Sequence, residues 1–196
     1  DLLKDPLKGL IVSLSLPAGT AMMFNTLYNV TGTFFAAKIS TLAVAGMSMS
    51  FLLYLSVVGI GLGFGSALTA LIGNSLGANK PKMAKLYAAN GIIFVLLFAL
   101  FMGLCGYLLA PNLLVILGAD HHYINEALDY AGVIFLAAPF FLLIKSLNGI
   151  LVALGDTKSY RNWLFCGLFI NAFFCYLFAF IFALGVKGLA LATASV

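Results

Sequence analysis

Hydrophobic and polar positions follow one another along this chain in long blocks. Apolar runs long enough to cross a bilayer, which takes about 20 residues, are separated by short segments that hold most of the charged side chains. The pattern predicts membrane-spanning helices at 9–35, 41–73, 83–109, 123–154 and 162–184. Residues 185–188 are expected to lead into the start of a sixth helix. The run at 41–73 exceeds what a bilayer requires, so we expect that helix to tilt or protrude. Short connections are expected at 36–40, 74–85, 111–122 and 155–161.

Turn and cap signals mark several of these boundaries. Gly77 is suited to the C-terminal cap of the second helix and Pro81 to the first turn of the third. Asp120 is placed to cap the fourth helix. Pro17 lies inside the first predicted helix and should bend it, because proline removes one backbone hydrogen bond.

Composition fixes the broad class. The chain is 63% hydrophobic and 8% charged, whereas a soluble domain carries roughly a quarter charged residues. It is therefore predicted to be an all-α polytopic membrane protein, and long runs of regular helix formers exclude an outer-membrane barrel. Three cysteines, Cys105, Cys166 and Cys175, fall inside predicted helices, so free thiols are expected, and no metal-ligand spacing is present.

The distribution of cations predicts an orientation. The net charge is +4, but cationic loops orient a membrane protein and need no anionic partner, so no nucleic acid is expected. With a cytoplasmic N-terminus, only Lys38 and Lys187 lie outside. The cations then inside are Lys4, Lys8, Lys80, Lys82, Lys85, Lys158 and Arg161. This bias predicts a multi-pass plasma (inner) membrane protein with its N-terminus in the cytoplasm.

A polar stripe runs along the first predicted helix. Asn25, Tyr28, Asn29 and Gly32 are three or four residues apart and share one helix face. Polar groups in hydrocarbon are costly unless they have partners. The stripe is therefore predicted to face the inside of a helix bundle, and we interpret that interior as a solute pathway.

Four glycines punctuate the second predicted helix. Gly59 with Gly63, and Gly61 with Gly65, form two overlapping GxxxG pairs, which let helix backbones approach closely. A phosphate-binding loop is disfavoured, because no strand precedes them and the GxGxxG spacing is absent. We expect the glycines to serve packing or bending.

Lys145 is the sharpest single candidate in the chain. A lysine near the middle of a span costs about 2.5 to 3.5 kcal/mol on insertion scales, so it should face a protein interior or an aqueous cavity. There it could hold an anionic substrate or a lipid phosphate; the alternative is that it extends toward the cytoplasmic interface. Asn148 should share its face.

Other polar residues have a structural alternative. Asn25, Asn29 and Asn171 either line the cavity or form hydrogen bonds between helices. Thr193 is expected to bond its own helix backbone. His121 and His122 are adjacent at a helix boundary and are interpreted as a solvated pair. An intramembrane serine protease is disfavoured, because these histidines, at a membrane surface, cannot reach Ser66.

Several segments together resemble one transporter family. Leu16-Pro17 followed by Thr26-Leu-Tyr-Asn-Val-Thr-Gly-Thr-Phe-Phe35 resembles the first helix of multidrug and toxic compound extrusion (MATE) transporters. Later segments agree with the family in order and spacing. These are Leu42-Ala-Val-Ala-Gly46, Gly61 through Lys80, Asn148 through Lys158, Asn171, and Leu184 through Thr193.

The resemblance implies a fold of two six-helix lobes related by pseudo-twofold symmetry. Residues 1–196 would form one membrane domain, the N-terminal six-helix lobe with its sixth helix truncated. The implied activity is secondary active efflux of amphipathic, often cationic, small molecules by H+ or Na+ antiport with alternating access. The implied partners are the lipid bilayer, the substrate and a missing C-terminal lobe. No cofactor is expected beyond the coupling ion, and no enzyme activity.

The resemblance also identifies departures from the family. Gly32 and Cys175 stand where family members commonly carry the aspartates that bind the coupling ion, helped by neighbouring asparagines and a threonine matched by Thr193. Coupling then resides in the missing lobe, or the chain is an altered relative. Two alternatives stay open: a lipid-linked saccharide flippase, which Lys145 favours, and a non-catalytic membrane subunit. The candidate pathway residues are Asn25, Tyr28, Asn29, Gly32, Lys145, Asn148, Asn171, Cys175 and Thr193.

Overall fold

The computed structural model describes residues 7–196, with side chains from Ser15 onward except at positions 17 and 18. The described part is helical throughout and contains no strand. Its elements are α1 (Leu7–Ile39), α2 (Thr41–Gly77), α3 (Pro81–Ile116), α4 (Ile124–Leu136), α5 (Ala138–Ala153), α6 (Lys158–Tyr176), the π-helical segment η1 (Leu177–Ile181) and α7 (Gly185–Ala194). The bend predicted at Pro17 concerns a residue outside the described side chains.

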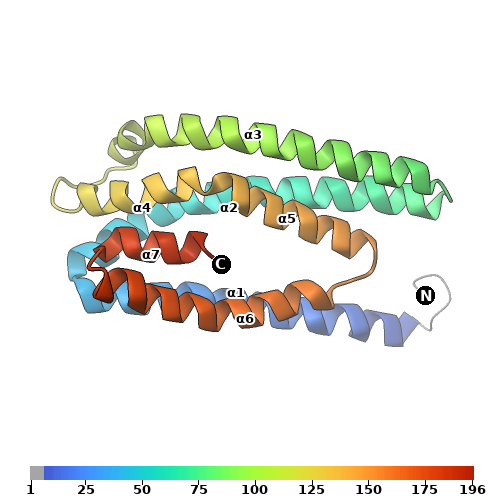
Figure 1. The fold of residues 1–196 in the computed structure, drawn as a ribbon, viewed down its shortest axis with the longest axis horizontal. Coiled ribbons are helices and arrows are strands. Elements are labelled where there is room, and N and C mark those ends of the chain that lie inside the picture. The colour runs from blue at the N-terminus through green and yellow to red at the C-terminus, as the bar shows by residue number, and fades with distance from the viewer. Residues whose placement is uncertain (1–6) are drawn as a thin grey trace.

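The helices run lengthwise through one bundle (Figure 1). Helix α2 packs most extensively against α5, and α1 packs against α6. The short α7 lies between these two groups and contacts both α4 and α6. The core of the first group contains fully buried Val57, Leu114, Ile134 and Leu142, contributed by α2, α3, α4 and α5 in turn.

Several helices can cross a membrane by length and composition. Among the described residues, α2, α3 and α6 with η1 pass this test, and α4 with α5 passes it as one bent pair. Helix α1 has 33 residues, which gives a length of about 50 Å, enough to span a bilayer. The prediction of an all-α polytopic membrane protein is confirmed.

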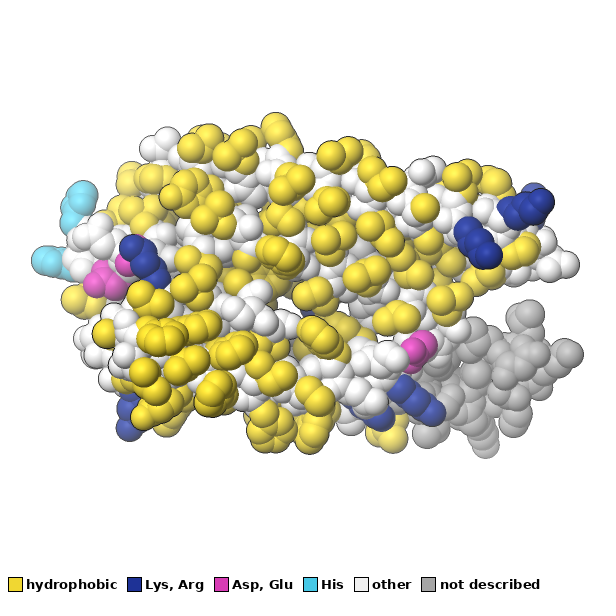
Figure 2. Space-filling view, in the orientation of Figure 1, with side chains coloured by type: hydrophobic (Ala, Val, Ile, Leu, Met, Phe, Trp, Pro, Cys, Tyr) yellow, Lys and Arg dark blue, Asp and Glu magenta, His cyan; other side chains and the backbone are white. Residues whose placement is uncertain are grey.

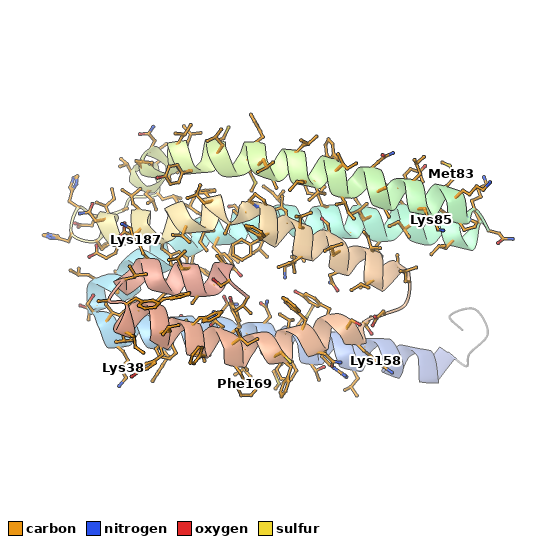
Figure 3. All side chains as sticks on the ribbon, in the orientation of Figure 1. Lys38, Met83, Lys85, Lys158, Phe169 and Lys187 are labelled. Atoms are coloured by element: carbon orange, nitrogen blue, oxygen red, sulfur yellow. The ribbon has the colours of Figure 1, made fainter. Side chains whose placement is uncertain are left out.

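Figure 2 shows hydrophobic side chains over most of the visible flank, with charged side chains gathered toward the two ends. Large apolar residues such as Phe169 and Leu97 are each 62% exposed, as expected of surfaces that meet lipid. Lys85 and Lys158 lie at one end of the bundle, and Lys38 and Lys187 lie at the other (Figure 3). The structure thus separates the cations near the α2–α3 and α5–α6 connections from Lys38 and Lys187.

All four predicted connections are shorter than expected, including that at 74–85, which the structure reduces to the three residues between α2 and α3. Helix α1 continues to Ile39, so only Ser40 separates it from α2, and the Ser40 hydroxyl accepts the N–H of Ala43 at 2.9 Å as an N-cap. Helix α3 continues through Pro111, which corrects the loop predicted at 111–122. Ala110 and Leu114 are both buried in the core, so packing on each side of Pro111 holds the helix together.

The fourth predicted span is not one straight helix. It consists of α4 and α5, which meet at Ala137 with a bend of 51°. Pro139 lies in the first turn of α5, where its missing N–H needs no intrahelical partner. The prediction of a continuous helix over 123–154 was therefore wrong at this junction.

Two predicted caps were wrong in their position. The left-handed residue after α2 is Asn79, with φ of 58°, and the N–H of Lys80 reaches the carbonyl of Ser75 at 2.8 Å in a Schellman arrangement. Gly77 is simply the last helical residue, whereas Pro81 begins α3 as predicted. Asp120 accepts the N–H of His122 at 2.9 Å within the preceding turn, so it does not cap α4.

The fifth predicted helix also differs at both ends. Asp156 accepts the N–H groups of Lys158 and Ser159 at 3.0 Å each, so α6 begins earlier than expected. It ends in η1. Ala183 in the following turn and Gly185 at the first position of α7 both have positive φ, of 53° and 56°. The three cysteines are free thiols, as predicted.

The glycines of α2 divide into two faces. A Cβ added at Gly65 would meet the backbone oxygen of Lys145 at 2.6 Å, and one at Gly61 would meet its Cγ at 3.2 Å. A Cβ at Gly59 or Gly63 would meet no described atom within 4 Å. Close packing is therefore confirmed for Gly61 and Gly65 and wrong for the other pair.

Candidate functional site

Two neighbouring cavities lie where α5 faces α1 and α6. The inner cavity has a volume of about 60 Å³ and extends to Tyr28 and Thr193. The outer cavity has a volume of about 430 Å³ and extends to Asn148. Both are lined by Asn25 and Lys145, and also by Val58, Tyr160 and Leu164. Asn25 and Tyr28 of the α1 stripe and Lys145 of α5 thus meet at the inner cavity.

Lys145 has a defined position between the two cavities. Its Nζ donates a hydrogen bond to the Tyr160 hydroxyl at 2.7 Å and lies 5.4 Å from the centre of the Tyr160 ring. Its side chain is half-buried. It is the one cation among the described residues that line either cavity, and none of those residues is a carboxylate. The partner of Lys145 is therefore neutral.

Asn148 lies one turn beyond Lys145 on the same face of α5 and lines the outer cavity. Its Oδ1 is buried without a hydrogen-bond partner among the described residues. A buried polar atom without a partner is costly. The Asn148 amide therefore retains unused hydrogen-bonding capacity beside the outer cavity.

Tyr28 connects the first helix to the last. Its hydroxyl donates to the backbone oxygen of Thr193 at 2.9 Å, so α1 is fixed to α7 at the wall of the inner cavity. The Thr193 hydroxyl donates to the carbonyl of Leu189 at 3.0 Å, which is the bond to its own helix that we expected.

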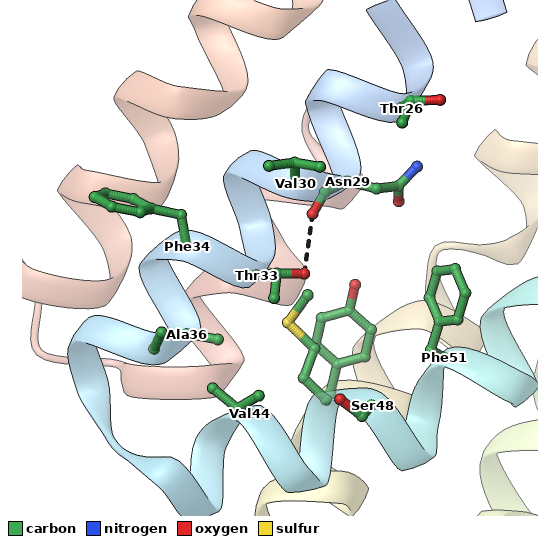
Figure 4. A pocket seen from close by; sticks show the side chains of 12 residues that line it. Thr26, Asn29, Val30, Thr33, Phe34, Ala36, Val44, Ser48 and Phe51 are labelled. Carbon is green, nitrogen blue, oxygen red and sulfur yellow. Dashed lines mark hydrogen bonds between the residues drawn. The ribbon is translucent and has the colours of Figure 1, made fainter. Parts of the chain in front are cut away.

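Asn29 faces a different space from its neighbour. Its Nδ2 donates to the backbone oxygen of Asn25 at 2.8 Å, and its side chain lines a cavity of about 720 Å³ between α1 and α2. Figure 4 shows this cavity, with Thr33 donating to the backbone oxygen of Asn29 at 3.2 Å. Tyr130 of α4 also lines it. The stripe therefore serves more than one cavity.

Gly32 is buried beside α2. A Cβ added there would lie 3.4 Å from Cε of Met47, an ordinary van der Waals distance. Met47 itself lines the α1–α2 cavity. Where the family resemblance leads us to expect a carboxylate, this chain presents a thioether and no charge.

Asn171 and Cys175 are both fully buried in α6, and neither lines any of these three cavities. The Cys175 Sγ donates to Oδ1 of Asn171 at 3.6 Å, and Nδ2 of Asn171 has no partner among the described residues. The structure pairs these two candidates with each other and does not bring them to Lys145.

Sequence reasoning missed Tyr160 and Trp163, which line the inner cavity, and also Tyr54 on its α2 wall. Tyr160 lies 15 residues from Lys145 and was assigned to a polar turn. An aromatic residue with a polar tip in the first turn of a helix was the available signal, but its direction depends on how α6 docks.

The two adjacent histidines do not line these cavities. His121 and His122 are exposed in the turn before α4, and no group of three potential metal ligands occurs among the described residues.

With this geometry in place, comparison with known proteins decides the family. The family model described as MatE matches residues 17–177. The chain belongs to the MatE family. Relatives of this MatE chain include an FAD transporter of Shewanella oneidensis, 25% identical over 81% of the chain, and the probable multidrug resistance protein YoeA of Bacillus subtilis, 28% identical over 60% of it. The probable multidrug resistance protein NorM of Listeria innocua is 26% identical over 79% of the chain.

Solved structures show the same fold. A MOP superfamily transporter from Pyrococcus furiosus, whose binding pocket is described as having reversed polarity, superimposes with a TM-score of 0.92 over 99% of the chain at 24% identity. An outward-facing multidrug resistance MATE transporter gives the same values. The MatE chain spans 43% of each of these proteins and 35% of the FAD transporter.

Proposed function

We propose that this MatE chain forms the N-terminal lobe of a two-lobe secondary transporter that exports amphipathic small molecules by alternating access. The observation that carries the proposal is the meeting of Asn25, Tyr28 and Lys145 at cavities inside a bundle with the MatE fold. Membrane transporters place binding sites at the interface between structural repeats. Polar residues deep in such a bundle are expensive and therefore usually functional.

Ion coupling is part of the proposal, with H+ or Na+ as the driving ion. In this lobe Gly32 and Cys175 stand where the resemblance leads us to expect aspartates, and the three cavities contain no carboxylate among their described lining residues. We therefore assign ion binding to the part of the transporter outside this chain.

The cationic substrates implied by the resemblance fit this lobe poorly, because Lys145 repels a cation. A flippase for lipid-linked saccharides is the second candidate, since the Lys145 ammonium suits a lipid phosphate. Under either function we place the protein in the plasma (inner) membrane with a cytoplasmic N-terminus. The cations of the α2–α3 and α5–α6 connections would then face the cytoplasm.

Efflux from cells that express the complete gene tests the transporter. We expect these cells to expel an amphipathic dye, with ethidium as the cationic probe and carboxyfluorescein as the anionic one, faster than cells with the empty vector. A proton uncoupler should abolish the difference if H+ drives export. Replacing the external Na+ separates the two ions. Absence of efflux together with loss of a cell-envelope polymer on gene deletion would replace the exporter with the flippase.

A further inference from the structure

We propose that Lys145, Tyr160 and Asn148 form a binding site for the anionic head of an amphipathic organic anion, a phosphate or carboxylate. The apolar body of the ligand occupies the outer cavity. This inference rests on the proposed transport function and specifies its substrate class.

The charge of Lys145 favours an anionic ligand. The Lys145 ammonium is half-buried, and the described residues around it supply no carboxylate. Its observed partner, the Tyr160 hydroxyl at 2.7 Å, is neutral. An ammonium has three donors, so two of them remain for a ligand. A cation taken out of water is stabilised when an opposite charge reaches it, and no described residue that lines these cavities supplies one.

The second argument is the fixed direction of the lysine. The aliphatic stem of Lys145 lies against Gly61, and its backbone oxygen lies against Gly65. Residues larger than glycine at these positions would push the α5 backbone away. The cation–π contact with Tyr160 holds the ammonium at the other end. Lys145 is therefore held at both ends, unlike a lysine that extends freely to the membrane interface.

The third argument is hydrogen bonding beside the charge. Asn148 lies one turn from Lys145, and its Oδ1 has no partner among the described residues. An amide offers an acceptor and two donors, so Asn148 can serve a hydroxyl or N–H of the ligand. A phosphate ester or a hydroxylated carboxylate presents both chemistries within one head group.

The fourth argument is the shape of the space. The inner cavity, about 60 Å³, has room for a head group only. The outer cavity, about 430 Å³, falls within the 300–1,000 Å³ typical of small-molecule sites. Its wall is largely apolar, with Met22, Leu62 and Val152 among the lining residues. A charged head beside Lys145 and an apolar body against this wall describe an amphipathic anion.

Binding to the purified complete protein in phosphatidylcholine nanodiscs tests the inference. The probe is 2-naphthyl phosphate, with neutral 2-naphthol and cationic 2-naphthylmethylammonium as matched compounds. We expect the phosphate to bind most tightly and Lys145→Met to weaken it about tenfold or more, the effect of losing a charge-assisted hydrogen bond. Lys145→Arg should retain affinity within a few-fold, which shows that the site still folds.

A lysine away from the site provides the matched control. Lys38→Met, an exposed lysine at the opposite end of the bundle, should leave binding unchanged. Equal affinity for the phosphate and the ammonium, or unchanged affinity in Lys145→Met, overturns the anion site. If ethidium efflux persists in that case, the transporter proposal survives alone. If no efflux occurs but Lys145-dependent phosphate binding is seen, the proposed function fails and the site stands.

A second arm distinguishes a soluble anion from a lipid head group. Nanodiscs that contain phosphatidylglycerol supply the same phosphate chemistry from the membrane. Unchanged naphthyl phosphate affinity supports the soluble solute. A loss of affinity that is larger in the parent protein than in Lys145→Met assigns the site to the lipid head group and overturns the solute assignment.

Discussion

Helix α5 meets different surroundings on its two sides. Toward α2, Gly65 and Gly149 bring the two backbones together, and the Thr69 hydroxyl donates to the carbonyl oxygens of both glycines, at 2.9 Å to Gly65 and 2.7 Å to Gly149. Toward α1 and α6, two cavities separate α5 from its neighbours, and Lys145 and Asn148 project into them. One helix therefore has a closed face and an open face.

The difference shows that small residues and polar residues have separate roles within the bundle. Glycines on the closed face remove side chains, so carbonyls and Cα atoms come into contact and a hydroxyl can bridge them. The open face carries polar side chains that line the cavities, and Oδ1 of Asn148 has no partner among the described residues. Lys145 contributes its backbone to the closed face and its ammonium to the open face. Packing at the closed face therefore positions the ammonium at the cavities.

The largest effect is expected from filling the closed face. Gly65→Leu places a side chain against the backbone oxygen of Lys145, which has no flexible end that can move aside. We expect a loss of about 1–3 kcal/mol from overpacking, measured as a lower midpoint of thermal unfolding for the complete protein. Gly63→Leu is the matched control, because a Cβ there meets open space. Equal midpoints for the two variants would show that the face is not closed in the membrane.

The next effect concerns the open face. Lys145→Met should reduce anion binding by about tenfold while leaving the thermal midpoint unchanged or raised, since it removes a half-buried cation that has no described carboxylate partner. Thermal unfolding without ligand measures the second part. A midpoint that falls as far as that of Gly65→Leu would make Lys145 a structural residue and would erase the contrast between the faces.

A smaller effect is expected from the hydroxyl that bridges the closed face. Thr69→Val keeps the shape and removes the hydrogen bonds to Gly65 and Gly149. Interhelical hydrogen bonds in membrane proteins are worth about 0.6 kcal/mol on average, so a slight fall in the thermal midpoint should follow. Ser56→Ala is the control, because Ser56 is exposed and bonds its own helix at Leu52. A larger fall in the thermal midpoint for Ser56→Ala than for Thr69→Val would show that the hydrogen bonds of Thr69 have no special role.

The smallest effect concerns the start of α6, which borders the open face. Hydrogen bonds from the hydroxyl and backbone N–H of Ser159 hold the pKa of Asp156 below its usual value. The ionised form is thus favoured in the folded state, so its stabilisation is present above the unfolded pKa and disappears as pH falls through the folded value. Asp156→Ala should lower the midpoint slightly at pH 7 and make no difference in strong acid. A difference that persists in acid would contradict this account.

The sequence anticipated the membrane class and the approximate helix positions because apolar runs of bilayer length are a local signal. It named Asn25, Tyr28 and Lys145 as pathway candidates, and the structure brings all three to the inner cavity. It did not anticipate the break at Ala137, because a long apolar run looks the same whether the helix is straight or bent. The π-helical end of α6 left no recognisable pattern either.

By itself, the sequence determined which residues share a helix face and which segments are too apolar for water. These follow from the helical period and from transfer free energies, which act within a few residues. The tertiary structure alone decided that Gly61 and Gly65 face α5 while Gly59 and Gly63 do not. Only the tertiary structure placed Tyr160 beside Lys145 and packed Met47 against Gly32. Such choices depend on how each helix rotates and tilts against its neighbours, and that is set by the packing of all of them together.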